Sequence, residues 1–348
     1  MNDLLSVRNV FKSFPARRSI GAVLRRQPGK RIVALDGVSL DLAPREIMGL
    51  VGESGSGKTT LARCLVRLVE PDEGEATFDG QDIFGATPTE LRAIRRRMQL
   101  IYQDPYSSLN PQLRVGEAIA EPARVHGLVH GREAEAALVA ELLEAVGLSR
   151  TEARRRPREL SGGQRQRVAI ARALAVQPEL LIADEAVSAL DVSVQAQILN
   201  LFSTLSRDRE LAMVFISHQL AVIAQLAQRV AIMYLGRIVE IGTTAEVFDS
   251  PKHPYTALLL AAHPTVDARR HGRSPAFQGE IPSPDAIPKG CRFRSRCPLA
   301  VAICAEVDPP PVDLGNGHLS WCHVTSCREA TSAVGSLPVP GSADGLQA

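Results

Sequence analysis

The sequence has no long hydrophobic run, little net charge and a single cysteine before residue 290. No apolar stretch approaches the ~20 residues of a membrane-spanning helix, and charges spread through positions 1–20 leave no core for a signal peptide. A net charge of +2 over 348 residues gives no reason to expect a nucleic-acid partner. The arginine runs at 92–97 and 154–158 are interpreted as solvated helix faces. We therefore expect a cytosolic chain with one large and one small domain, unless a partner recruits it to a membrane.

The stretch Gly52–Thr59 matches the phosphate-loop pattern G-x-x-x-x-G-K-[ST]. It lies between a short apolar run, 47–51, that predicts a buried strand and a helical pattern over 60–69 that stops before Pro71. Backbone N–H groups of such a loop point at phosphate oxygens, and the following helix adds its positive end. We expect Lys58 to bridge the β- and γ-phosphates and the Thr59 hydroxyl to bind Mg²⁺. The residues expected to hold the nucleotide phosphates are Gly52, Ser54, Gly55, Gly57, Lys58, Thr59 and Thr60.

Polar residues follow three further predicted strands. Gln103 ends the strand predicted at 98–103, Asp184 and Glu185 follow 180–183, and His218 follows 212–216. Parallel strands present such residues at one sheet edge. We expect Thr59, Gln103 and Asp184 to bind Mg²⁺, Glu185 to orient or deprotonate a water, and His218 to sense the γ-phosphate.

Two more segments complete the candidate nucleotide site. Ser161-Gly162-Gly163-Gln164 opens a helical pattern over 165–176, where a Ser N-cap and two glycines indicate a second anion site. Asp191 precedes a helix predicted at 194–206, and a helical region is expected over 115–147. Phe14, at the end of a strand predicted from Leu4, either stacks on adenine or is a core residue.

In order and spacing, these motifs resemble those of an ABC transporter ATP-binding subunit, over about residues 4–327. Segments 106–111, 187–193 and 252–256 resemble the peptide/nickel importer branch, and the basic loop after Phe14 resembles the second ATPase of dipeptide and oligopeptide systems. The resemblance implies an α/β P-loop NTPase with a RecA-like core and a helical subdomain at about 105–175, within an ATP-binding domain over 1–250. It departs from the usual residues at Phe14 (for Tyr), Ala186 (for Pro) and Gln219 (for Asp).

The family implies an ATPase that drives import by closing a head-to-tail dimer, in which Ser161–Gln164 of one subunit covers ATP bound to the other. The implied partners are two permease subunits, a sibling ATPase or a second copy, and an extracytoplasmic solute-binding protein, with the chain peripheral on the cytoplasmic face of the membrane. Dipeptides, longer peptides, nickel chelates and glutathione all remain open as solutes. The alternative, a soluble ABC-type ATPase acting on nucleic acid or ribosomes, usually carries two cassettes or a long coiled coil, and this chain shows neither.

The last part of the chain, 251–327, reads as a separate loop-rich module. Four of its cysteines follow C-x5-C-x6-C-x17-C: Cys291, Cys297, Cys304 and Cys322. Thiolates this dense indicate a metal site in place of a hydrophobic core. The resemblance implies a [4Fe–4S] cluster; zinc and reduced structural thiols are the alternatives. Cys327 is left over, the tail 328–348 is expected to be disordered, and Cys64 is expected to be a buried small hydrophobe.

Overall fold

The computed structural model describes residues 3–16, 31–104, 108–262, 282 and 287–325. The chain divides into two compact units, Met1–Ile238 and Val239–Ala348. Within the described ranges, no helix is both long and apolar enough to cross a bilayer. Cys327, the tail 328–348 and most of the basic loop after Phe14 lie outside the described residues, as do Tyr106 and Ser107 of the 106–111 segment.

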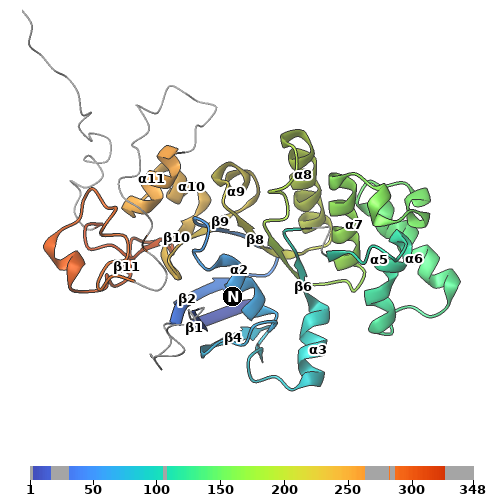
Figure 1. Ribbon diagram of the computed structural model, residues 1–348, viewed down its shortest axis with the longest axis horizontal. Coiled ribbons are helices and arrows are strands. Elements are labelled where there is room, and N and C mark those ends of the chain that lie inside the picture. The colour runs from blue at the N-terminus through green and yellow to red at the C-terminus, as the bar shows by residue number, and fades with distance from the viewer. Residues whose placement is uncertain (1–2, 17–30, 105–107, 263–281, 283–286, 326–348) are drawn as a thin grey trace, which may run out of the picture. The chain divides into compact units, whose positions relative to one another are not determined.

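A parallel sheet forms the centre of the first unit (Figure 1). Its strands pair in the order β9, β3, β8, β7, β6, all in parallel. The side chains of β3, β7 and β8 are entirely buried, as expected for strands covered on both faces. The carboxyl ends of these strands therefore share one edge. The strands are β3 (Ile47–Val51), β6 (Met98–Ile101), β7 (Leu180–Asp184), β8 (Ala212–Ser217) and β9 (Arg229–Tyr234).

A second, antiparallel sheet lies against the phosphate loop. Its order is β2, β1, β4, β5, from β1 (Leu5–Pro15), β2 (Arg31–Leu42), β4 (Glu73–Phe78) and β5 (Gln81–Asp82). Strand β2 comes so close to the loop that a Cβ on Gly57 would lie 2.3 Å from the carbonyl oxygen of Ala34. Gly57 also has φ +105°, which L side chains rarely adopt. Glycine is required here for both reasons.

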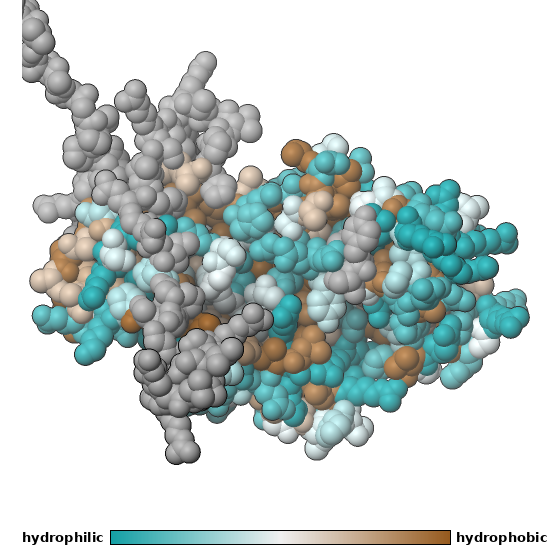
Figure 2. Space-filling model, viewed as in Figure 1, coloured by the Kyte–Doolittle hydropathy of each residue, from teal (hydrophilic) through white to brown (hydrophobic). Residues whose placement is uncertain are grey.

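The helices of the first unit cover the parallel sheet and build a helical group from α5, α6 and α7, which pack on one another (Figure 1). On the face shown in Figure 2, hydrophilic side chains dominate the surface of this group. Short 3₁₀ turns at Arg150–Arg154 and Pro157–Glu159 lead into α7. The helices are α2 (Lys58–Leu65), α3 (Pro88–Arg97), α5 (Val115–Val125), α6 (Arg132–Ala145), α7 (Gly162–Leu174), α8 (Val192–Asp208) and α9 (Leu220–Leu226).

Three expectations from the sequence need correction. The helical region 115–147 is two helices, because Gly127 and Gly131 take positive φ between them. Helix α2 ends at Leu65 rather than at residue 69, since Arg67 is left-handed, and Leu68 is 52% exposed. The arginine run at 92–97 is not simply solvated. Arg95 donates to the carbonyls of Val66 and Arg67, and Arg97 pairs with Asp79 and Glu179.

In the second unit, a buried carboxylate ties segments together. Glu240 has no exposed surface and accepts hydrogen bonds from the backbone N–H of Lys252 (2.8 Å) and His253 (2.9 Å), while the His318 ring nitrogen Nε2 lies 2.8 Å away. Strand β12 pairs antiparallel with β10 and with β11. The elements are β10 (Arg237–Thr243), α10 (Thr244–Asp249), α11 (Pro254–Ala262), a 3₁₀ turn Ala302–Ala305, β11 (Val312–Asp313) and β12 (Leu319–Ser320).

Candidate functional site

The phosphate loop joins β3 to α2, and its lysine is turned onto the loop itself. Lys58 Nζ donates to the carbonyl oxygens of Gly52 (2.7 Å) and Glu53 (2.9 Å) and to Ser56 Oγ (3.2 Å). Burial lowers the pKa of Lys58, while the nearby carboxylates, Glu185 foremost, oppose that shift. A Cβ on Gly52 would lie 2.2 Å from the Met233 carbonyl, so this position also excludes a side chain. The loop presents one buried cation at the start of a helix.

Thr59 and Asp184 meet beside this loop. The Thr59 hydroxyl donates to Asp184 Oδ1 at 3.1 Å, although the two residues are far apart in the sequence. Asp184 ends the buried strand β7, and burial raises the pKa of its carboxyl group. A hydroxyl and a buried carboxylate, both hard oxygen donors, fit the ligand preference of Mg²⁺. The pair therefore suits a magnesium ion that would share the site with a nucleotide.

One oxygen of Glu185 gathers two other predicted site residues. Gln103 Nε2 donates to Glu185 Oε2 at 3.0 Å, and His218 Nδ1 lies 3.4 Å from the same atom. The three side chains follow β6, β7 and β8, which are neighbours in the sheet. Glu185 takes a left-handed φ of 48°, and its N–H donates to the carbonyl of Ile216. The carboxylate is thus held by two polar side chains at the edge of the sheet, as a positioned acid or base requires.

Ser161 begins α7 with a capping box. Its Oγ accepts from the N–H of Gln164 (3.3 Å), and Gln164 Oε1 accepts from the N–H of Ser161 (2.9 Å). A Cβ on Gly163 would lie only 2.4 Å from Val194 Cγ1, in the first turn of α8. The glycine thus lets the start of α7 pack against the start of α8, just after Asp191. Asp191 is the exposed N-cap residue of α8 and makes no side-chain capping bond.

Comparison with known proteins decides what this arrangement is. Residues 35–188 match the ABC transporter family, and residues 239–304 match the oligopeptide/dipeptide transporter C-terminal region. The chain is 48% identical over 345 residues to a probable peptide ABC transporter ATP-binding protein of Sinorhizobium fredii, covering 98% of this chain and 96% of that protein. The chain belongs to the ATP-binding proteins of the ABC transporter family.

Two further comparisons agree with this membership. The ABC subunit is 44% identical over 326 residues to the oligopeptide transport ATP-binding protein AppF of Bacillus subtilis, covering 93% of this chain and 98% of that one. A solved dimeric ATP-binding cassette, MJ0796 bound to ADP and phosphate, superposes with a TM-score of 0.60 at 29% identity, covering 69% of this chain and 98% of that one. The expected P-loop ATPase cassette is confirmed, and the chain is an ATPase of this class. The alternative as a nucleic-acid or ribosome ATPase is not favoured.

Phe14 lies near the phosphate loop of this ABC ATPase. In the antiparallel sheet it pairs with Ile32, two residues before Ala34, whose carbonyl is the atom that crowds Gly57. The ring is half-buried, and the Lys12 ammonium lies over it at 5.5 Å from the ring centroid. Both sequence-based alternatives for Phe14, a base-stacking residue and a core residue, suit a half-buried ring.

The sequence analysis missed one contact near His218. Gln195, buried in α8, donates through Nε2 to Gln219 Oε1 at 2.7 Å, and Gln219 directly follows His218. In the sequence, Gln219 stands out only as a departure from the family's usual Asp. No single-sequence signal pairs two glutamines 24 positions apart.

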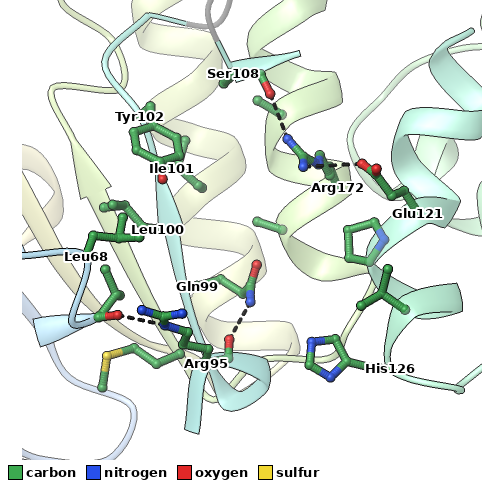
Figure 3. A pocket seen from close by; sticks show the side chains of 16 residues that line it. Leu68, Arg95, Gln99, Leu100, Ile101, Tyr102, Ser108, Glu121, His126 and Arg172 are labelled. Atoms are coloured by element: carbon green, nitrogen blue, oxygen red, sulfur yellow. Dashed lines mark hydrogen bonds and ion pairs between the residues drawn. The ribbon is translucent and has the colours of Figure 1, made fainter. Parts of the chain in front are cut away.

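A cleft of about 380 Å³ opens beside β6, between that strand and helices α5 and α7 (Figure 3). Arg172 of α7 reaches into it, donating to the Ser108 carbonyl at 2.7 Å and facing Glu121 at 3.4 Å. Large apolar side chains are exposed at its border: Leu68, Tyr102 and Val125. Tyr102 immediately precedes Gln103, so this cleft adjoins the strand end that contacts Glu185.

The four predicted cysteine ligands are free thiols in the second unit. Burial raises the pKa of Cys291 to about 11 and of Cys297 to about 12, and the remaining thiols of the set contribute to both shifts. The thiols therefore lie within electrostatic reach of one another. Among the described residues, however, no group of three or more His, Cys, Asp or Glu is arranged to hold a metal ion. Cys64 is fully buried in α2, as expected for a small hydrophobe.

Proposed function

We propose that this ABC ATPase energises the import of peptides or related small solutes across a membrane. The observation that carries the proposal is the match of residues 239–304 to the oligopeptide/dipeptide transporter C-terminal region, in a chain whose relatives align along nearly their whole length. Both relatives carry peptide or oligopeptide transport in their names. The likeness extends beyond the ATP-binding cassette itself, which favours this branch over other ABC ATPases.

In the proposed hydrolysis, Glu185 acts as the general base. The oxygen of the attacking water bonds to the γ-phosphorus while the bond from that phosphorus to the bridging oxygen of ADP breaks, and the proton of the water passes to Glu185. Gln103 and His218, which meet at Glu185 Oε2, orient the carboxylate and contact the γ-phosphate. Thr59, Gln103 and Asp184 would hold Mg²⁺, which supplies positive charge to the phosphate oxygens.

We further propose that two ATPase subunits pair head to tail, so that Ser161–Gln164 of one covers ATP held by Gly52–Thr60 of the other. The support is a helix start with two glycines and an exposed Asp191 beside it. A helix N-terminus attracts phosphate through its N–H groups and its dipole. The second subunit is a sibling ATPase or a second copy of this chain, and each closed site binds phosphate from both sides.

The cleft beside β6 is the proposed docking surface for a cytoplasmic segment of a permease subunit. Its border combines exposed apolar side chains, Tyr102 at 38% and Val125 at 57% exposure, with the charged pair Arg172 and Glu121. Exposed apolar groups of this size mark interaction surfaces. Because Tyr102 adjoins Gln103, a movement of Gln103 on binding of the γ-phosphate would be transmitted to a permease bound here. Two permease subunits and a solute-binding protein complete the proposed complex on the cytoplasmic face of the membrane.

For the second unit, we propose that Cys291, Cys297, Cys304 and Cys322 hold a [4Fe–4S] cluster. Its support is that all four thiols are free and lie in one small module. Cluster binding would require them to converge, because among the described residues they form no group arranged to hold a metal. Visible absorbance with matching iron and sulfide in anaerobically prepared protein tests this, and colourless protein that contains zinc would reverse it. The module is proposed to span 251–327, after an ATP-binding domain over 1–250.

The experiment that tests the proposed function is purification of the tagged chain from gently solubilised membranes, with co-purifying proteins identified by mass spectrometry. Two permease subunits and a partner ATPase are the expected companions, and an associated binding protein would supply the solute for uptake assays. Recovery of soluble or ribosomal proteins alone would overturn the transporter assignment. ATP hydrolysis would then be examined with nucleic acid as activator.

The proposed base is tested by Glu185→Gln. We expect kcat for ATP hydrolysis to fall about 10²–10⁴-fold, the usual contribution of a positioned base, while ATP still binds because the phosphate loop is untouched. Glu210→Gln is the matched control, since Glu210 forms a well-exposed ion pair with Arg45. Turnover by Glu185→Gln at the parent rate would remove Glu185 from this role.

A further inference from the structure

We propose that Lys12 is a base-recognition residue of the nucleotide site. Its ammonium, held by Asp72, lies over one face of the Phe14 ring and strengthens the stacking of adenine on the opposite face. This inference rests on the proposed nucleotide site and on Phe14 as its stacking residue. It adds to that site a cation that contacts neither the phosphates nor Mg²⁺.

Lys12 is held by an ion pair with Asp72, whose carboxylate also binds the neighbouring strand residues. Its Nζ donates to Asp72 Oδ1 at 2.8 Å, and its side chain is only 15% exposed. The other oxygen of Asp72 accepts from the N–H (2.8 Å) and the hydroxyl (2.7 Å) of Ser13, and from Arg31 NH2 (3.3 Å). These bonds, that of Lys12 foremost, hold the pKa of Asp72 well below its ordinary value. Asp72 stays ionised throughout the physiological range.

Asp72 thereby anchors the end of β1 that carries Phe14. Its N–H donates to the Phe11 carbonyl at 2.8 Å, and its carboxylate holds both Lys12 and Ser13. The three residues of the strand that precede Phe14 are thus tied to the turn that follows α2. Burial raises the pKa of the Cys64 thiol of α2, and the Lys12 and Asp72 charges make smaller, opposite contributions to that pKa.

The location suits a base rather than a phosphate. Phe14 pairs with Ile32, and in the strand of Ile32 the carbonyl oxygen of Ala34 lies where it would crowd a Cβ on Gly57, the N-cap residue of α2. Strand residues two apart are separated by about 6.8 Å, so the ring lies within a nucleotide's length of the phosphate loop. A phenyl ring has no polar atom to fix its orientation, unlike the Tyr usual in this family. The ammonium of Lys12 at 5.5 Å supplies a directional contact instead.

The cation also changes what the ring attracts. An ammonium over one face draws π-electron density toward itself, which leaves the opposite face less electron-rich. Adenine is an electron-rich base, and it stacks better on such a face. Lys12 would therefore act through the ring, and its effect would depend on the presence of a base in the ligand.

Calorimetric titration of the full-length protein with ATP and with inorganic tripolyphosphate tests the inference. Lys12→Met keeps the aliphatic stem and removes the charge. We expect it to weaken ATP binding about two- to fivefold, the size of one cation–π contact, and to leave tripolyphosphate binding unchanged. Asp72→Asn is expected to act in the same direction, because it releases Lys12. Lys12→Arg should restore base-dependent affinity, since guanidinium also binds aromatic faces.

Arg8→Met is the matched control, a cation lost from the same strand, where Arg8 pairs with Asp41 away from Phe14. Equal loss of ATP and tripolyphosphate affinity in Lys12→Met would overturn the inference, because general charge attraction would then explain the effect. Unchanged ATP binding would overturn it as well. Phe14→Ala distinguishes failure of the Lys12 inference from failure of the stacking site on which it rests. If Phe14→Ala also leaves the ratio of ATP to tripolyphosphate affinity unchanged, the proposed stacking site itself is wrong.

Discussion

Replacing Gln195 by methionine is expected to loosen the segment that carries His218. Gln195 is buried in α8, and its amide donates to Gln219 Oε1 at 2.7 Å. The Gln219 N–H in turn donates to Ser217 Oγ at 2.9 Å. The two bonds thus fix the residues that precede and follow His218, Ser217 and Gln219. Methionine fills a similar volume without a donor, so the substitution removes one hydrogen bond and little packing.

The loss in free energy of unfolding depends on the hydrogen bond that the substitution removes. A hydrogen bond between neutral groups contributes about 0.5–1.5 kcal/mol net. Gln219 is half-buried, so water can replace its lost donor, and we expect the lower part of that range. The His218 contact with Glu185 Oε2 would be held less firmly. We therefore expect kcat for ATP hydrolysis to fall severalfold while the Kd for ATP stays the same, since neither glutamine belongs to the phosphate loop.

A double-mutant cycle with Gln195→Met and Gln219→Met measures the coupling. Chemical denaturation and steady-state ATPase assays should both show a coupling of about 0.5–1 kcal/mol. Gln219→Asp should retain activity, because the family's usual carboxylate accepts the same bond. The control is Gln197→Met on the same helix, where Gln197 is exposed and accepts only a long bond, 3.3 Å, from Arg167. Additive effects of the two substitutions would refute the reasoning. A loss of stability with unchanged kcat would show that the bond between Gln195 and Gln219 has a structural role only.

Two other predictions concern ionisable groups. Asp184→Asn should raise the thermal unfolding temperature of nucleotide-free protein in EDTA, while it abolishes Mg²⁺-dependent hydrolysis. Burial raises the pKa of Asp184, so its ionised form costs stability at neutral pH. A lower unfolding temperature of the variant would contradict this prediction. Burial lowers the pKa of His253 to about 4, so stability is full above its unfolded pKa of ~6.5 and is lost as pH falls to 4, by ~3 kcal/mol. Fluorescence of Trp321, the single tryptophan, should report this loss in the second unit, and His253→Asn, whose amide oxygen can still accept the Tyr255 N–H, should flatten it.

Local signals predicted the parts of the site that lie in one segment. The apolar run at 47–51 is β3 to the residue, because a short strand buried on both faces needs every side chain apolar. The glycine spacing of the phosphate loop is likewise a local demand, as the crowding at Gly52 and Gly57 shows. The start of helix α3 could also have been predicted from the sequence. Thr87-Pro88-Thr89-Glu90 is a capping box with proline at the first helical position, and the pattern analysis overlooked it.

What could not be predicted depends on the order of strands. The meeting of Gln103, Glu185 and His218 at one oxygen requires β6, β7 and β8 to be adjacent, while β3 separates β8 from β9. Period and composition do not encode which parallel strands are neighbours. The same holds for Lys12 and Asp72, which are 60 residues apart. The early end of α2 has no sequence signal either, because an arginine at position 67 gives no hint of a left-handed conformation.

The contacts around α8 connect the two halves of the proposed ATP site within one chain. The first turn of α7 packs through Gly163 against Val194, one residue before Gln195. Gln195 bonds to Gln219, beside His218, and His218 faces Glu185. In a head-to-tail dimer, Ser161 would bind the partner's nucleotide, while Glu185 would act on the nucleotide of its own chain. A shift of α7 toward α8 would either move α8 or strain its packing, because there is no free space beside Gly163 on the side of Val194. Within one chain, the first turn of α8 therefore links the start of α7 to the segment that carries His218.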